Sequence, residues 1–314
     1  MLKVFTPILK VGIPNGSLID SNRGGLKELL ANARIDIKNL GESGPLETLN
    51  IPWLYPIPGR PQELPALAAD GYVDVFFCGD DWAREWELRG KQNKKILGLG
   101  TGKVEIVFAS KGSEVALGRI ASEYPYITRD FMQNIKDVSL PITPLEELAK
   151  SSLSCTIVPS YGTTEAKNYY GICDSIVEAS QSGNTLEKYG LKIIQKVMAS
   201  ECSLYSNEDT LADPWKRKKA FRLKMMLEGV ISAKGKDLIT FNVPNRRLGE
   251  ILEYIQKNRL FGDEETVIRG KRMSEITLEV SSRDRNLPLI DIIGDLKDRG
   301  ASSIEGIPLS YSIR

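Results

Sequence analysis

A short apolar run that ends in a serine- and glycine-rich loop constrains this chain more than any other feature. Ser175–Val177 lies between the carboxylates of Asp174 and Glu178 and has the character of a buried strand. The loop that follows is Ser180-Gln181-Ser182-Gly183-Asn184. Thr185 suits a helix N-cap, and apolar residues then recur at helical spacing: Leu186, Ile193, Ile194 and Val197. Strand, glycine loop and helix in this order predict an α/β unit.

The loop has the composition of a phosphate-binding segment. A helix N-terminus leaves backbone N–H groups unpaired and carries partial positive charge, so a loop placed there can hold a phosphate. Carboxylates accept hydrogen bonds from the vicinal hydroxyls of a sugar, as the acidic residue of dinucleotide folds does. Asp174 and Glu178 would therefore suit the sugar that carries the phosphate. A capped helix after a tight turn is the alternative, because motifs of this length often match by chance.

Composition excludes several classes of protein. A chain of 314 residues with 41% hydrophobic and 26% charged residues is long enough for two or three globular domains. The net charge of +1 gives no overall field that would favour nucleic acid or an anionic membrane. No apolar run approaches the roughly 20 residues of a membrane helix, and the N-terminus lacks a signal-peptide pattern. We therefore expect a cytoplasmic protein.

Cysteine and histidine usage narrows the chemistry. The four cysteines are scattered without a C-x-x-C pair, which indicates buried, reduced thiols instead of a zinc site or a disulfide framework. The chain has no histidine. This excludes Ser-His-Asp hydrolysis, Cys-His proteases, H-E-x-x-H metal sites and a histidine general base. Any reaction must rely on carboxylates, cations, backbone dipoles or a bound metal.

The first part of the chain contains a further α/β unit. The strand around Val11 ends at the Asn15-Gly16 turn, and the next helix has Leu26, Leu29 and Leu30 on its apolar side. Ligands of such folds collect where strands end, so this turn is a candidate site, although simple turn chemistry explains it equally well. Arg60 is the best cation here for a phosphate, with a surface arginine as the alternative. Pro65 fits the first turn of a helix.

Two segments complete this part of the chain. A buried strand after Asp74 ends at Gly79-Asp80-Asp81, and the charge-rich segment 84–95 is expected to form a solvated helix and loop. Another unit has strands at 104–109 and 155–158, with a helix that begins at Thr128. Tyr161–Glu165 either lines a cleft or is a plain loop.

The C-terminal third predicts a separate small domain. The basic run 212–219 has no interleaved aromatic residues of a nucleic-acid site and is expected to begin a helix. Strands are expected at 237–243, 265–268, 275–280 and 304–313, and helices at 248–255 and 289–296. That order, β-α-β-β-α-β, is the ferredoxin-like arrangement.

Eight residues around the loop resemble, in spacing, the signature of ATP phosphoribosyltransferase, the first enzyme of histidine biosynthesis: Glu165, Gly171, Asp174, Glu178, Ser182, Gly183, Thr185 and Leu186. Shorter segments are similar to other motifs of that family. Arg60–Pro65 resembles R-x-x-[DE]-I-P, 119–125 resembles R-I-A-T-x-Y-P, and 212–217 reads A-D-P-W-K-R as in long-form members. Two segments depart from the family: Asn15 replaces the lysine of P-K-G-[RS]-L, and Phe76–Cys78 replaces Gly-Ile-Thr.

The resemblance implies an α/β fold with two periplasmic-binding-protein-like domains that form a cleft, plus a C-terminal ferredoxin-like regulatory domain. The implied boundaries are 1–103 with 189–219, 104–188, and 220–314. The implied reaction joins adenine N1 of ATP to C1′ of phosphoribosyl pyrophosphate and releases pyrophosphate with Mg²⁺ present. Histidine is the implied feedback inhibitor, and a homo-hexamer the implied assembly. Two alternatives remain open: a two-lobed binding or sensor protein without catalysis, and a paralogue that ribosylates another acceptor.

The resemblance also implies roles for individual residues. The ribose hydroxyls would face Asp174 and Glu178, and the 5′-phosphate would bind Ser180–Thr185. The other substrate-binding residues it implies are Asn15, Gly16, Arg60, Glu63, Asp81 and Glu165. It does not identify the ligands of the metal.

Overall fold

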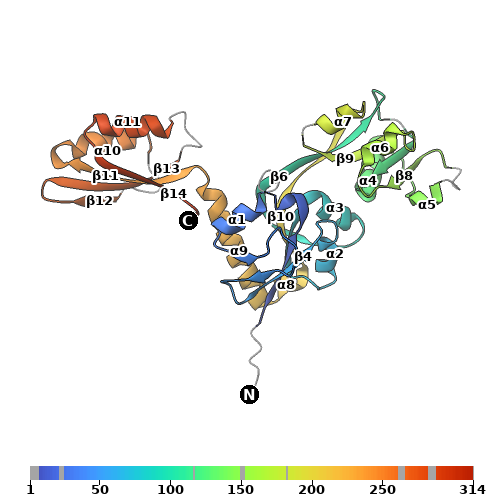
Figure 1. Cartoon of the computed structure of the whole chain (residues 1–314), viewed down its shortest axis with the longest axis horizontal. Helices are drawn as coiled ribbons and strands as arrows, with labels where there is room; N and C mark the ends of the chain where they lie inside the picture. The colour runs from blue at the N-terminus through green and yellow to red at the C-terminus, as the bar shows by residue number, and fades with distance from the viewer. Residues whose placement is uncertain are drawn as a thin grey trace, which may run out of the picture. The chain divides into compact units, whose positions relative to one another are not determined.

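The computed structural model describes residues 7–20, 25–115, 117–148, 153–181, 183–260, 266–281 and 288–313. Contacts divide the chain into two compact units, Met1–Lys224 and Met225–Arg314. Within the described ranges, no helix combines the length and the apolar character that crossing a membrane requires. Figure 1 shows the path of the chain through both units.

The first unit is built on one eight-stranded mixed sheet in the order β4-β1-β5-β10-β6-β9-β7-β8. Its strands are β1 (Leu9–Pro14), β4 (Leu54–Gly59), β5 (Val75–Gly79), β6 (Lys94–Ser110), β7 (Arg119–Ser122), β8 (Thr156–Pro159), β9 (Ser175–Ser180) and β10 (Lys192–Ser206). The strands β2 (Ile37–Lys38) and β3 (Glu47–Thr48) pair separately. We call the parallel group β4-β1-β5 the first lobe and the parallel group β9-β7-β8 the second lobe.

Two long antiparallel strands, β6 and β10, connect the lobes (Figure 1). They pair with each other from Lys192 opposite Ser110 to Ser206 opposite Lys94. At their ends β10 pairs with β5 and β6 pairs with β9. Both lobes therefore share one pair of strands, β6 and β10. The parallel strands of each lobe end near this shared pair.

The prediction of a helix from Leu186 to Val197 is wrong. The helix α7 (Asn184–Lys188) is five residues long, and β10 begins at Lys192. Gly190, with φ of +72°, ends the helix in the left-handed conformation that favours glycine. Ile193, Ile194 and Val197 are β-branched and suit the extended strand, although their spacing also fits a helix.

The remaining helices of the first unit pack against the sheet. They are α1 (Leu26–Asn32), α2 (Leu64–Ala69), α3 (Asp80–Leu88), α4 (Pro125–Lys136), α5 (Leu145–Leu148), α6 (Thr164–Tyr169) and α8 (Glu208–Ala212). The predicted apolar side of α1 is confirmed because Leu26, Leu29 and Leu30 are buried. The helix predicted from Thr128 begins three residues earlier, at Pro125. The segment predicted as a solvated helix contains the fully buried Glu85.

The second unit has a four-stranded antiparallel sheet in the order β12-β13-β11-β14. Its elements are β11 (Lys236–Pro244), α10 (Leu248–Lys257), β12 (Thr266–Arg269), β13 (Met273–Ser281), α11 (Leu289–Asp298) and β14 (Ser302–Pro308). The helix α9 (Pro214–Ala233) precedes them and extends from the first unit into the second. Alternate β11 residues such as Ile239 and Phe241 join one apolar core with Ile251 of α10 and Ile292 of α11. Gly300, with φ of +91°, follows α11 in the left-handed conformation that favours glycine.

Candidate active site

Residues that follow the parallel strands of both lobes line three pockets. This is the position at which open α/β sheets bind their ligands, outside the carboxyl ends of the strands. The contributing residues are Ser17 after β1, Arg60 after β4, Asp80 after β5, Glu123 after β7, Ser160 after β8 and Ser180 at the end of β9. Both lobes therefore contribute to the candidate site.

The first of these, which we call the loop pocket, has a volume of about 310 Å³. It brings Ser17 of the first lobe together with the serine- and glycine-rich loop of the second. Its lining residues are Ser17, Val104, Glu165, Ala179, Ser180, Gln181, Gly183, Thr185 and Leu186. Ser182 lies outside the described residues. Residues far apart in the sequence thus meet around a cavity large enough for a phosphate and part of a sugar.

The backbone of the loop depends on Gly183, which precedes α7 with φ of +76° and acts as its N-cap in place of the predicted Thr185. The Gly183 amide donates a hydrogen bond to Ser180 Oγ at 3.0 Å. A Cβ at Gly183 would lie 3.7 Å from Ile193 Cδ1, which is ordinary contact. The left-handed conformation, and not lack of space, is therefore what favours glycine here. Asn184 is the first residue of α7.

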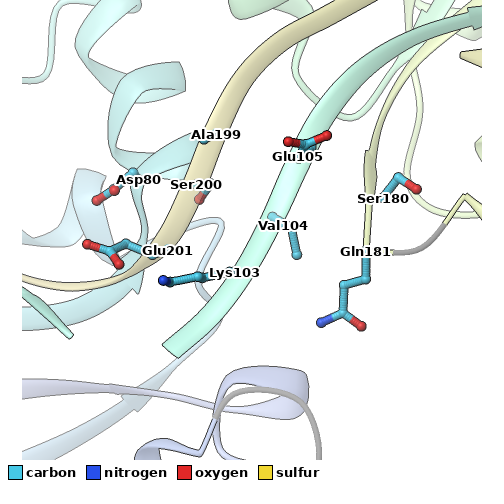
Figure 2. A pocket seen from close by; sticks show the side chains of 9 residues that line it. All are labelled: Asp80, Lys103, Val104, Glu105, Ser180, Gln181, Ala199, Ser200 and Glu201. Carbon is cyan, nitrogen blue, oxygen red and sulfur yellow. The ribbon is translucent and has the colours of Figure 1, made fainter. Parts of the chain in front are cut away.

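The second pocket, which we call the strand pocket, has a volume of about 570 Å³ and shares Ser180 and Gln181 with the loop pocket. Figure 2 shows Glu201 of β10 on one side of β6, and Ser180 of β9 with Gln181, the residue after that strand, on the other. Lys103 of β6 is an exposed cation between them. The sequence did not single out Lys103, because no pattern distinguishes it from a solvent-facing lysine of any strand.

Three glutamates of the second lobe interact near these pockets. Burial raises the pKa of Glu178 to about 7, and the charges of Glu123 and Glu165 add to this effect. Burial likewise raises the pKa of Glu123. The Ala179 amide donates to Glu178 Oε1 at 2.9 Å. Perturbed carboxylates clustered beside a cavity are typical of functional sites. Glu123 was overlooked in the sequence, although its position directly after a strand was a usable signal.

Asp81, which the resemblance places among the substrate-binding residues, is instead enclosed by protein. Tyr124 Oη donates to its Oδ2 at 2.8 Å, and Ser200 Oγ donates to its Oδ1 at 2.8 Å. The residue is only 5% exposed, and burial raises its pKa. One carboxylate oxygen therefore joins α3 to Tyr124, the residue before α4, and the other joins α3 to Ser200 of β10. The neighbouring Asp80 lines the strand pocket and pairs with Lys95 at 2.8 Å.

Asp174 does not lie beside Glu178 as the resemblance implies. It precedes β9, whereas Glu178 and Ser180 lie toward the other end of that strand. At about 3.3 Å per residue, Asp174 and Ser180 are roughly 20 Å apart. Asp174 Oδ2 accepts a hydrogen bond from the Arg119 amide at 2.8 Å, which connects the starts of two parallel strands. This placement corrects the interpretation of Asp174 as a ribose ligand.

The third pocket, which we call the arginine pocket, has a volume of about 660 Å³. Charged and aromatic side chains of both lobes line it: Arg60, Trp82, Arg89, Glu123, Tyr126 and Tyr161. Among the residues expected to bind substrate, Arg60 lies in this pocket. Glu63 Oε1 accepts a hydrogen bond from the Arg60 amide at 2.8 Å, so Glu63 shapes the turn before α2.

The described part of the turn after β1, residues 15–20, carries no cation. Asn15 is exposed, and its amide donates to the Gly59 carbonyl at 3.0 Å. Gly16 has φ of +79° and begins a short 3₁₀ helix that ends at Leu18. Ser17 is the residue of this turn that lines the loop pocket. The positive charge for a polyphosphate must therefore come from other elements.

Comparison with known proteins gives consistent matches. The family model of ATP phosphoribosyltransferase matches residues 60–229. A protein named ATP phosphoribosyltransferase from Nitratidesulfovibrio vulgaris is 29% identical over 260 residues, which are 79% of this chain and 80% of the relative. One of the same name from Pelotomaculum thermopropionicum is 25% identical over 314 residues, or 97% of this chain and 99% of the relative.

A solved structure supports the α/β fold. One chain of the ATP phosphoribosyl transferase (HisG:HisZ) complex from Thermotoga maritima has a TM-score of 0.56 and 22% sequence identity. The match covers 72% of this chain and 99% of that chain.

Proposed function

This chain belongs to the ATP phosphoribosyltransferase family, and from that premise we propose how its pockets perform the family reaction. The reaction is the first step of histidine biosynthesis: adenine N1 of ATP attacks C1′ of phosphoribosyl pyrophosphate. The N1–C1′ bond forms, the bond from C1′ to the pyrophosphate oxygen breaks, and pyrophosphate leaves. The observation that carries the proposal is the loop pocket, in which Ser17 of the first lobe meets residues of the second lobe: Glu165, Ser180, Gln181, Gly183 and Thr185.

We assign the 5′-phosphate and ribose to the loop pocket. The backbone around Gly183 permits close approach of a phosphate, and the side chains of Ser180, Gln181 and Thr185 supply further polar contacts. Glu178 extends from the same strand and would accept hydrogen bonds from the ribose hydroxyls. When a metal ion binds beside it, the raised pKa of Glu178 would fall and its charged form would predominate.

The chemistry requires little acid–base catalysis. Adenine N1 attacks with a lone pair, so no strong base is needed, in agreement with the absence of histidine. Charge develops on the departing pyrophosphate, and cations stabilise it. Holding two polyanionic substrates in line is the main task left for the protein. Two cations are available for this purpose: Lys103 in the strand pocket and Arg60 in the arginine pocket.

Magnesium fits the acidic residues of the second lobe. Mg²⁺ in phosphate-transfer sites is commonly held by one or two carboxylates together with substrate phosphates, so a complete protein cage is not required. In the described part of the chain, no group of three or more acidic or cysteine side chains is arranged to hold a metal. We propose Glu178 and Glu165 as its protein ligands. Their two negative charges repel each other, and a bound cation would relieve that repulsion. The metal would neutralise the pyrophosphate charge.

The test of the proposed function is turnover with ATP, phosphoribosyl pyrophosphate and Mg²⁺, measured by the absorbance of the product. Glu178→Gln should lower kcat/KM by about one to two decades, since it removes a charged hydrogen-bond acceptor. Chelation of Mg²⁺ should abolish turnover. A wild-type protein that binds both substrates without forming product would refute the proposal and favour a binding protein.

We also propose that the second unit is a ferredoxin-like regulatory domain of a homo-hexamer inhibited by histidine. Support comes from its element order, β11-α10-β12-β13-α11-β14, and from its separate apolar core. Histidine titrated into the turnover assay should inhibit the full-length protein. Unchanged rates at saturating histidine would refute feedback through this domain.

A further inference from the structure

The arginine pocket contains a guanidinium group in a fixed orientation. Arg89 Nε and Nη2 donate to Glu85 Oε1 at 3.1 and 2.7 Å. The guanidinium carbon lies 4.6 Å from the ring centre of Trp86 and 4.9 Å from that of Tyr126. Two rings and a carboxylate thus orient Arg89, whose side chain is 27% exposed. A ligand that binds it would lose little side-chain entropy.

Glu85 does not simply cancel the charge of Arg89. Its side chain is fully buried, and its carboxylate also accepts hydrogen bonds from the amides of Tyr126 and Ile127 at 2.9 to 3.1 Å. These amides belong to the first turn of α4, a helix of 12 residues, whose N-terminus carries partial positive charge. One carboxylate therefore serves both a guanidinium and a helix N-terminus, and the local balance remains positive.

Two guanidinium groups retain free donors toward the pocket. The interactions of the described residues give no acceptor for Arg89 Nη1 or for the Arg60 side chain. Arg60 comes from the turn after β4 and Arg89 from the residue after α3, so both belong to the first lobe. Glu123 also lines the pocket, but the two guanidinium groups outnumber its single carboxylate there.

We propose that Arg89, with Arg60, binds a polyphosphate group of a substrate in the arginine pocket, and that Glu85 positions Arg89 for this role. The inference rests on the proposed function and adds a cation that the family motifs of the sequence do not indicate. Planar guanidinium groups bind phosphate through two parallel hydrogen bonds. Residues 15–20, the described part of the turn after β1, contain no lysine or arginine, whereas Arg60 and Arg89 both line this pocket. The polyphosphate is the triphosphate of ATP or the pyrophosphate of phosphoribosyl pyrophosphate.

The test compares Arg89→Gln with Arg84→Gln. Arg84 lies in α3, the helix that Arg89 directly follows. It pairs with Glu87 at 2.9 Å and with Asp130 of α4 at 3.4 Å, but it lines a different cavity. Both substitutions remove one positive charge and one contact between α3 and its surroundings. Inorganic tripolyphosphate is titrated into each protein while tryptophan fluorescence is recorded, since Trp82 lines the pocket and Trp86 contacts Arg89.

Arg89→Gln should weaken tripolyphosphate binding roughly ten- to hundredfold, the effect of losing a charged hydrogen bond. Arg84→Gln should bind as the wild type does. Arg89→Lys keeps the charge without the planar group and should give an intermediate loss. Equal affinity in Arg89→Gln and wild type, or an equal loss in Arg84→Gln, would overturn the proposal.

Steady-state kinetics identifies the substrate. A rise in KM for ATP alone assigns the triphosphate to Arg89, and a rise in KM for phosphoribosyl pyrophosphate alone assigns the pyrophosphate. A lower kcat with both KM values unchanged would overturn the binding role. Glu85→Gln should raise the same KM as Arg89→Gln, which loss of stability alone would not do. If wild-type protein binds tripolyphosphate through Arg89 but forms no product, the proposed function fails and the anion site stands.

Discussion

Replacing Glu178 by glutamine should stabilise the ligand-free protein while it impairs the reaction. Burial and the neighbouring glutamates raise the pKa of Glu178 from an ordinary 4.5 to about 7. The folded state therefore binds more protons than the unfolded state between these values, and the free energy of unfolding falls as the pH rises through this window. The complete pKa difference corresponds to about 3 kcal/mol, an upper bound because solvent reaches the half-buried side chain.

The amide of glutamine does not ionise, so Glu178→Gln removes this loss. At pH 8, and without Mg²⁺ or substrates, the variant should be more stable than wild type by up to about 3 kcal/mol. At pH 4 the two should be nearly equal. Urea unfolding at both pH values gives the comparison, and Glu187→Gln, an exposed residue of α7, is the matched control. A difference between variant and wild type that does not change with pH would refute the reasoning.

Two further substitutions test the loop and the contact between the lobes. Gly183→Ala places a side chain at φ of +76°, so the free energy of unfolding should fall by about 1 kcal/mol. The KM for phosphoribosyl pyrophosphate should rise, and an unchanged KM would contradict the phosphate assignment. Tyr124→Phe removes a donor to the buried Asp81 and should cost about 1–3 kcal/mol in urea unfolding, whereas Tyr72→Phe, at an exposed position, should cost nothing measurable; equal stability of both variants would contradict a structural role for Asp81.

Local patterns predicted most elements of the fold. Leucines at helical spacing located α1, Pro65 located α2, and alternating apolar residues located β13. The failure at 186–197 has a physical cause: Ile193, Ile194 and Val197 satisfy both a helical stripe and a strand. The pairing of β10 with β5 and β6 decides between the two, and that pairing joins residues about a hundred positions apart.

The sequence predicted the site residues that follow directly after a strand. It did not predict which carboxylates are buried by packing against other elements. Ser180, Gly183 and Thr185 lie around one pocket because a single loop connects them. Asp81 and Glu85 are acidic residues of one helix, yet their burial depends on Tyr124 and on the N-terminus of α4. These partners come from another strand–helix unit, so no local pattern could show that both carboxylates bind protein.

A Gly-x-x-Asp motif occurs once in each lobe, and its aspartate has the same structural role in both. Gly71-x-x-Asp74 and Gly171-x-x-Asp174 each follow a short helix, and both glycines have positive φ, +80° and +73°. Asp74 Oδ2 accepts the Lys10 amide at 2.8 Å, just as Asp174 accepts that of Arg119.

Each aspartate thus joins the starts of two parallel strands in its own lobe. The two lobes differ at the position four residues after each aspartate, near the end of the strand. There the first lobe has the buried Cys78, whereas the second lobe has Glu178. Position along the strand, more than residue type, therefore separates the carboxylate that builds the lobe from the one that we propose binds the ribose.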